Sequence, residues 1–209
     1  MSKKIALCLY GRYNNHYNPK TSGDDGCKYI YKTIIKNFKN IDIFIHSWDI
    51  SKEKHIINNY KKFVKDSKFE QQIDFSNIIK QNNIYELAYN NPKRDRFRTI
   101  GNWLSFFYSR KATIELKKLY EEKNNFIYDC CLVCRFDLGQ VDKYNGYQPY
   151  KVSEINFNPN LDMKYIYSAM WNQLNCGYAD QWFYSSSKNI NFLTQMYQKS
   201  FEYFRHNSE

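Results

Sequence analysis

The sequence lacks the patterns that mark several common protein classes. No apolar run approaches the roughly 18 residues of a membrane span, and the first one stops at Gly11, too early for a secretory signal. Repeats, low-complexity blocks and linker-like stretches are absent. With 43% hydrophobic and 25% charged residues, the composition excludes disordered, collagen-like and disulfide-scaffold chains. We therefore expect a single cytoplasmic domain over residues 1–209, without a transmembrane segment.

Signature motifs of several enzyme and metal-binding classes are also missing. The chain has no G-x-G-x-x-G, no G-K-[ST] and no G-x-S-x-G, which disfavours dinucleotide folds, P-loops and hydrolases. Cys131 and Cys134 match C-x-x-C, but no second pair stands at zinc spacing, and the four histidines show no metal spacing. The cysteine pair lies in an apolar run typical of a buried strand, where residues three apart face opposite sides. We expect all six cysteines to be reduced thiols.

The charge is strongly positive but dispersed. Lys and Arg total 31 against 21 Asp and Glu, a formal charge of +10. Such an excess suggests nucleic acid, phosphate or anionic lipid as a partner. Most of the positive residues are lysines spread along the chain, which favours a solvated lysine-rich surface. A basic nucleic-acid-binding module with Tyr and Phe for base stacking remains an alternative, although no RNP-like motif, zinc finger or concentrated basic stripe accompanies it.

Apolar runs alternate with helical patterns along the chain. A strand over residues 4–10, a helix over 27–38 and a strand over 41–46 predict a parallel pair with a right-handed crossover. Further helices are predicted over 51–64, 99–122 and 188–204, further strands over 68–73, 127–136, 163–168 and 181–184, and loops over 82–97 and 144–160. The predicted fold is one α/β domain with a mostly parallel central sheet flanked by helices. Such sheets bind ligands beyond the carboxyl ends of their strands.

Two strand ends carry residues suited to a phosphorylated ligand. Arg135 and Asp137 follow the most buried strand, so the carboxylate suits a hard divalent cation and the guanidinium, on the same side, suits a phosphate. A structural Arg–Asp pair closing the strand is the alternative. At the end of the first strand, Gly11 lets a ligand approach the backbone, Arg12 adds positive charge and Tyr10 could line a base pocket.

Two further segments carry candidate polar groups. Asn102 and Ser105 share one face of the helix predicted over 99–122, close to its start, where phosphate or ribose is readily held. The segment 171–183 is dense in amides and aromatic rings around Asp180, which suits sugar binding and a general base. The structural alternatives are a polar helix flank and an aromatic core edge that Asp180 caps.

Taken in order, these segments resemble a known enzyme family. The chain reads L-Y-G-R, I-D-I-F-I-H-S-W-D, R-x-x-x-N-x-x-S-x-x-Y-S, Y-D-x-x-x-x-x-R-F-D-L and G-x-x-D-Q-W-F-Y, spread roughly over residues 5–192. It looks like the small GT-A-type nucleotide-sugar glycosyltransferases of large DNA viruses and bacterial surface-polysaccharide systems. Each motif is loose, and the order of the motifs carries the specificity. The resemblance implies a Rossmann-like, GT-A-like domain with a nucleotide-binding N-terminal half and an acceptor-binding C-terminal half.

The resemblance also assigns roles to residues of this chain. Such enzymes typically hold Mn²⁺ or Mg²⁺ on a D-x-D motif, of which the matching positions 135–137 keep only Asp137. Asp180 matches the carboxylate that deprotonates the acceptor hydroxyl. The expected nucleotide-binding residues are Tyr10, Gly11, Arg12, Trp48, Arg98, Asn102, Ser105 and Arg135, and the expected acceptor or sugar residues are Trp171, Asn172, Gln173 and Trp182.

The implied function is glycosyl transfer from a nucleoside-diphosphate sugar, with a UDP-sugar as the expected donor and a glycan or other hydroxyl as acceptor. The transition state is oxocarbenium-like, and the departing diphosphate gathers negative charge that a metal and arginines stabilise. A base on the opposite face favours inversion. Because the first carboxylate of the metal motif is missing, a catalytically inactive glycan-binding domain of the same fold is a further alternative.

Overall fold

The computed structural model describes residues 3–14, 20, 22–82, 100–139, 141–142, 150–151, 154–169 and 181–206, and confirms an α/β fold. Its central sheet has the order β3-β2-β1-β4-β8-β7. The strands are β1 (Ile5–Gly11), β2 (Ile41–Ser47), β3 (Val64–Phe69), β4 (Cys130–Arg135), β7 (Tyr167–Ser168) and β8 (Trp182–Ser185). The first four are parallel, whereas β8 runs antiparallel to both β4 and β7. The sheet is therefore mostly parallel, as predicted, with an antiparallel edge.

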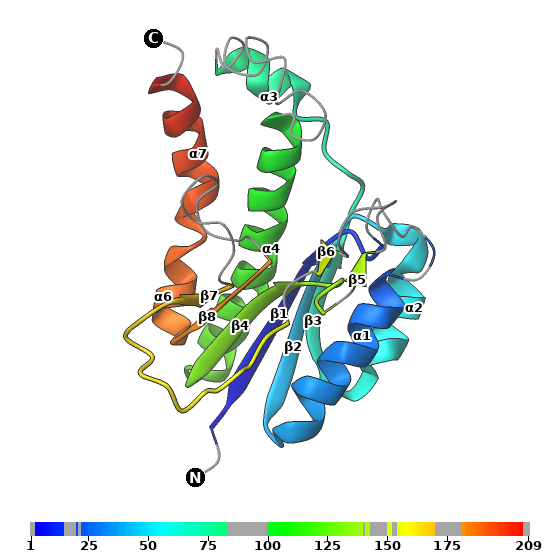
Figure 1. The fold of residues 1–209 in the computed structure, drawn as a ribbon. Helices are drawn as coiled ribbons and strands as arrows, with labels where there is room; N and C mark the ends of the chain where they lie inside the picture. Colours follow the sequence, from blue (N-terminus) through cyan, green and yellow to red (C-terminus); the bar gives the residue numbers. More distant parts are fainter. Residues whose placement is uncertain are drawn as a thin grey trace.

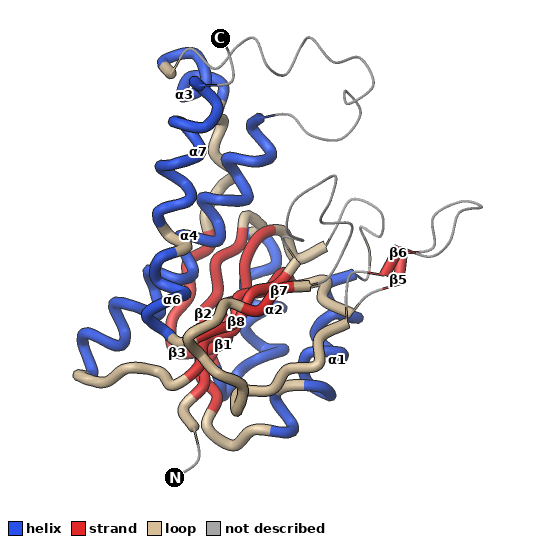
Figure 2. Tube along the Cα trace, turned by 60° about the vertical axis from the view of Figure 1, so that its left-hand side comes forward, coloured by secondary structure: helices blue, strands red, loops and turns tan. Residues whose placement is uncertain are grey.

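Helices cover both faces of the sheet (Figures 1 and 2). On one face lie α1 (Ser22–Thr33) and α2 (Glu53–Tyr60); on the other lie α4 (Ile100–Asn124), α6 (Ser187–Phe192) and α7 (Gln195–His206). The remaining elements are α3 (Ser76–Gln81), a small sheet of β5 (Val141–Asp142) and β6 (Tyr150–Lys151), and the 3-10 turns η1 (Ile35–Asn37), η2 (Ile50–Lys52) and η3 (Lys61–Phe63).

Alternation along β1 divides the core into two layers. Leu7 and Leu9 pack with Ile30 of α1, whereas Cys8 on the opposite face packs with Ile114 of α4. Side chains of successive strand residues point to opposite faces, so a strand covered on both sides is apolar throughout. This explains why the run that begins at Ile5 is continuously hydrophobic.

Several predicted boundaries were wrong, mostly where the local pattern is weak. The helix expected over 27–38 runs from Ser22 to Thr33 and is followed by the turn η1, and the strand expected over 127–136 spans only Cys130–Arg135. The helix expected over 51–64 ends at Tyr60, and the third strand begins at Val64 rather than at residue 68. This edge strand is only partly buried, so no continuous apolar run marks it. The C-terminal helix is broken between Phe192 and Gln195, where the Thr194 hydroxyl donates to the Asn191 carbonyl at 2.7 Å.

Candidate ligand site at the carboxyl edge of the sheet

The strand order places a topological switch point between β1 and β4. The chain passes from β1 to β2 and β3 on one side of the sheet and then crosses to β4 on the other. The order β3-β2-β1-β4 is that of doubly wound sheets, in which ligands bind where the connections diverge. Tyr10 pairs with Arg135 across the two strands, so Gly11 and Phe136 leave the sheet as neighbours. The two predicted strand ends, Gly11–Arg12 and Arg135–Asp137, therefore meet. The end of β2 lies on the other side of Gly11, which pairs with Ser47.

The end of β1 leaves room for a ligand. Gly11 has a φ of +98°, and a Cβ built at this residue would meet nothing within 4 Å among the described atoms. Its N–H donates to the Ser109 hydroxyl of α4 at 2.8 Å, which fixes the turn. The next residue, Arg12, is exposed. A positive φ favours glycine, so this turn combines an open backbone with an adjacent positive charge.

The end of β4 is closed by an ion pair. The Arg135 guanidinium donates to both oxygens of Asp137, from Nε to Oδ1 at 2.9 Å and from Nη2 to Oδ2 at 2.6 Å. The Asp137 side chain is 4% exposed and that of Arg135 is 34% exposed. A bidentate pair of this kind fixes the guanidinium plane. The geometry matches the structural Arg–Asp alternative, with the arginine as the more exposed partner.

This pairing does not fit a resident metal at Asp137. Both carboxylate oxygens accept from a guanidinium, so a divalent cation would have to displace a positive charge to reach them. Within the described ranges, no group of three or more His, Cys, Asp or Glu side chains could hold a metal ion. Metal assistance therefore stays a prediction that this carboxylate does not support by its geometry.

The first turn of α1 packs closely against the end of β4. A Cβ at Gly26 would lie 1.9 Å from the Phe136 carbonyl oxygen, so only glycine permits this approach. Asp24 in the same turn accepts from the Tyr13 hydroxyl and from His55 Nε2, both at 2.7 Å. Burial raises the pKa of Asp24, but the hydrogen bonds from His55 and Tyr13 outweigh this and hold it below its usual value. The helix start thus carries its own anion, so a phosphate is better placed near the arginines.

A buried row of hydrogen-bonded side chains behind Gly11 was missed by sequence reasoning. His46 of β2 is fully buried, with Nδ1 2.6 Å from Ser109 Oγ and Nε2 2.8 Å from Glu70 Oε1. Burial lowers the pKa of His46, although Glu70 opposes this. Burial raises the pKa of Glu70, but hydrogen bonds from Lys68 and His46 outweigh it and lower the pKa.

This row of hydrogen-bonded side chains has the order Ser–His–Glu, yet it is unsuited to nucleophilic catalysis. Ser109 is fully buried and its hydroxyl already accepts from the Gly11 N–H, so a substrate cannot reach it. The arrangement instead connects Glu70, after β3, through His46 to the turn at Gly11. The signal that could have found it is a histidine at the end of an otherwise apolar strand.

Trp48 lies at the end of β2, as predicted, and is almost buried. Its ring stacks on Tyr108, with centroids 5.4 Å apart and planes 26° apart, and meets His46 edge-on. The ring is 7% exposed, and its Nε1 has no hydrogen-bond partner in the part of the chain that the structure describes. Buried N–H groups are nearly always paired. Trp48 therefore offers a donor at this edge.

The other predicted residues are less well placed. Tyr10 is 1% exposed and packs edge-on against Phe106, and Trp182 is 8% exposed and stacks on Tyr184, so both rings belong to the core. Ser105 bonds to Gln72 at 2.9 Å. On α4 it is Ser109 that reaches Gly11, and the exposed Asn102 lies about 10 Å further along the helix at 1.5 Å per residue.

Five predicted residues lie outside the described residues: Arg98, Trp171, Asn172, Gln173 and Asp180. Gln181, which follows Asp180, is described and buried, and its carbonyl accepts from the Arg135 N–H at 3.2 Å. The start of β8 therefore lies beside the end of β4, at the same edge of the sheet as Gly11.

Comparisons with known proteins add no relative to this picture. No family model, no curated protein and no solved structure matches the chain. Among the described helices, none combines the length and the apolar character needed to cross a bilayer. The case for a function at this edge accordingly rests on its geometry.

Proposed function

We propose that this chain is a glycosyltransferase of GT-A type that binds a UDP-sugar at the carboxyl edge between β1 and β4. The observation that carries the proposal is the pairing of Tyr10 with Arg135, because it brings the open Gly11 turn and two arginines to one switch point. Arginine guanidinium groups bind phosphate oxygens in a forked geometry. A diphosphate with a sugar attached is the substrate that such a position suits.

In this proposal Arg135 stabilises the departing diphosphate and Asp137 positions Arg135. The buried carboxylate fixes the guanidinium plane before substrate arrives, so little reorganisation is needed as charge develops. Because both oxygens of Asp137 accept from Arg135, the proposal routes no step through a metal held at this carboxylate. Asp180 remains the proposed base toward a glycan hydroxyl.

Calorimetry with UDP tests the nucleotide site. Wild-type protein is expected to bind UDP, and Arg12→Ala or Arg135→Lys to weaken binding about tenfold to a hundredfold, since a hydrogen bond to a charged group contributes about 1.5–3 kcal/mol. Arg135→Lys retains the positive charge and removes only the paired hydrogen bonds that a guanidinium group donates. The exposed Lys80, on α3, gives a control in Lys80→Ala, which should bind as the wild type does. Failure of the wild type to bind UDP would remove the proposal.

Two further measurements separate the roles at the site. If the Arg135–Asp137 pair persists in the complex, chelation by EDTA leaves UDP affinity unchanged, whereas a cation on Asp137 makes the affinity depend on Mn²⁺. Asp180→Asn should keep UDP binding and stop sugar transfer. Continued turnover in that variant would assign the base to another group, and UDP binding without transfer in the wild type would favour an inactive domain.

A further inference from the structure

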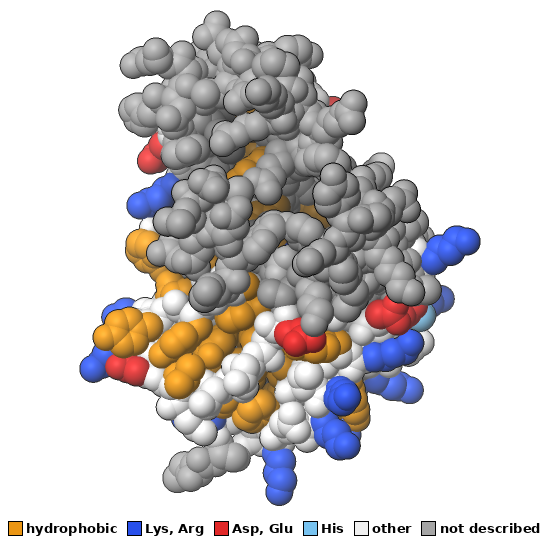
Figure 3. All heavy atoms as spheres, in the orientation of Figure 1, with side chains coloured by type: hydrophobic (Ala, Val, Ile, Leu, Met, Phe, Trp, Pro, Cys, Tyr) orange, Lys and Arg blue, Asp and Glu red, His pale blue; other side chains and the backbone are white. Residues whose placement is uncertain are grey.

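The amino edge of the sheet, opposite the candidate ligand site, is rich in lysine. The amino ends of β1, β2, β3 and β4 lie together because these strands are parallel. Exposed lysines precede three of them: Lys4 before β1, Lys39 before β2, and Lys61 and Lys62 before β3, with Lys65 in β3 itself. Figure 3 shows Lys and Arg side chains at the bottom and lower right of the molecule, with others on its left-hand side.

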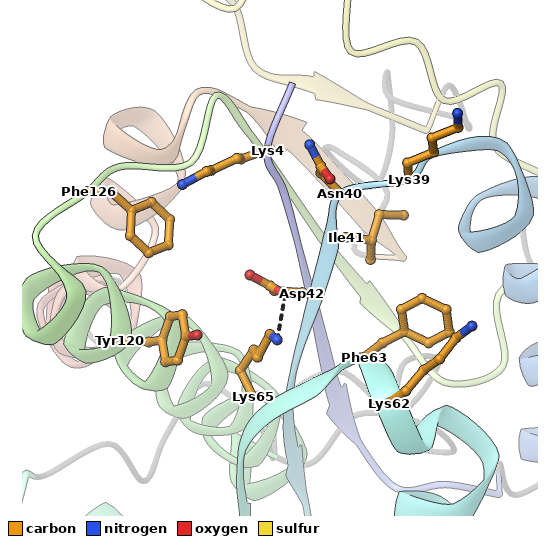
Figure 4. Close-up of a pocket in the computed structure, with 10 residues that line it drawn as sticks. All are labelled: Lys4, Lys39, Asn40, Ile41, Asp42, Lys62, Phe63, Lys65, Tyr120 and Phe126. Carbon is orange, nitrogen blue, oxygen red and sulfur yellow. Dashed lines mark ion pairs between the residues drawn. The ribbon is translucent and has the colours of Figure 1, made fainter. Parts of the chain in front are cut away.

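A shallow hollow of about 520 Å³ lies among these lysines (Figure 4). Four of its lining side chains are lysines and one is a carboxylate, Asp42, which pairs with Lys65 at 3.3 Å and accepts from the Tyr128 hydroxyl at 2.7 Å. The amines do not converge. Figure 4 shows Lys39 and Lys62 pointing outward, away from Asp42, and Lys4 directed toward Phe126. Divergent charges suit an extended anionic surface better than a compact anion.

An exposed apolar side chain stands at the same edge. Ile127, in the turn before β4, is 74% exposed. Its neighbour Phe126 is covered by Lys4, whose Nζ lies 4.3 Å from the ring centroid. A single-stranded nucleic acid is typically bound by stacking its bases on exposed flat rings, which Phe126, covered by Lys4, does not offer. Lysines beside an exposed aliphatic side chain are typical of surfaces that rest on anionic lipid.

We propose that the amino edge, comprising Lys4, Lys39, Lys62, Lys65 and Ile127, docks on the surface of a membrane that carries anionic lipid. The lysines would contact headgroup phosphates, and Ile127 would enter the boundary between headgroups and acyl chains. The strands then point away from the bilayer, so the carboxyl edge stays open to the aqueous phase. The proposal does not depend on the reaction at that edge.

Sedimentation with lipid vesicles tests the proposal. Wild-type protein is expected to bind vesicles of phosphatidylcholine with phosphatidylglycerol and not to bind vesicles of phosphatidylcholine alone. The bound protein should dissociate as the salt concentration is raised. The double variant Lys39→Gln with Lys62→Gln should bind about 30-fold more weakly, since each lysine near such a surface contributes about 1 kcal/mol. Ile127→Ser should weaken binding several-fold at unchanged charge.

The matched control removes the same charge elsewhere. Lys80 on α3 and Lys199 on α7 are exposed and lie on helices that extend toward the opposite end of the molecule (Figure 1). Lys80→Gln with Lys199→Gln should bind vesicles as the wild type does. Equal loss in both double variants would show that net charge alone is responsible and would overturn the proposal.

Two other results would also overturn it. Equal binding to neutral vesicles would exclude the lysines as the cause. Binding of duplex DNA at physiological salt, with no binding to anionic vesicles, would identify a nucleic acid as the partner of this edge. Circular dichroism establishes that each variant is folded, and retained UDP binding by Lys39→Gln with Lys62→Gln would separate this proposal from the nucleotide site.

Discussion

The two edges of the sheet use polar residues in opposite ways. At the carboxyl edge, Asp137 and His46 are buried and each meets its partners at 2.6–2.9 Å. At the amino edge, lysines such as Lys39 and Lys62 are exposed and diverge. A buried polar group is expensive to leave without its partner, whereas an exposed charge contributes little to folding. The first edge should therefore tolerate substitution poorly and the second easily.

The largest effect is expected from opening the Arg135–Asp137 pair. Arg135→Met removes two hydrogen bonds from a carboxylate that is 4% exposed and should lower the free energy of unfolding by about 4 kcal/mol. Urea denaturation measures the change. The control is the exposed pair of Lys118 and Glu122, 3.8 Å apart, where Lys118→Met should cost less than about 0.5 kcal/mol. Equal losses in the two variants would contradict the contrast between buried and exposed pairs.

The next effect concerns the contact of α1 with the end of β4. Gly26→Ala places a Cβ 1.9 Å from the Phe136 carbonyl oxygen, so the helix or the turn must shift, and we expect a loss of about 3 kcal/mol. The Cβ of Gly11→Ala meets no described atom within 4 Å, so this variant should cost only about 1 kcal/mol for its φ of +98°. Thermal unfolding of both variants checks the order, and a greater loss at Gly11 would contradict it.

The sequence revealed the carboxyl edge better than the contacts within it. The apolar runs at Ile5 and Ile41 predicted two buried parallel strands, and parallel strands bring their carboxyl ends together, so the meeting of Gly11 and Arg135 followed from topology. The bidentate Arg135–Asp137 pair was only one of two alternatives. Spacing along a strand determines the face of the sheet on which a side chain lies, but it does not determine that side chain's hydrogen-bond partner.

Long-range polar contacts were beyond the reach of local pattern. His46 and Ser109 are 63 residues apart, and a serine within a helix carries no signal of a buried hydroxyl. The antiparallel direction of β8 was also unforeseen, since a strand of four residues reads the same in either direction. The hydrophobic pattern of the sequence therefore predicted the layers of sheet and helices. Which polar side chains contact one another depends on tertiary packing, which the pattern does not reveal.

A smaller effect is expected from pH through His46. Its ordinary pKa is 6.5, and burial lowers the pKa in the folded protein, while Glu70 and Lys68 are the charged groups nearest to it. Below pH 6.5 the unfolded chain takes up a proton that the folded chain resists, so stability present above pH 6.5 is lost as pH falls. The slope should reach at most about 1.4 kcal/mol per pH unit. His46→Gln should flatten the curve just below pH 6.5; an unchanged slope would assign the loss of stability to other groups.

The smallest effect on folding is expected at the amino edge. Lys39→Gln with Lys62→Gln alters two exposed side chains, so the free energy of unfolding should stay within about 0.5 kcal/mol of the wild type. Urea denaturation and vesicle sedimentation on the same samples give the sharpest form of the comparison, because binding should fall while stability does not. A loss of stability as large as that of Gly26→Ala would mean that these lysines support the fold, and the contrast between the two edges would fail.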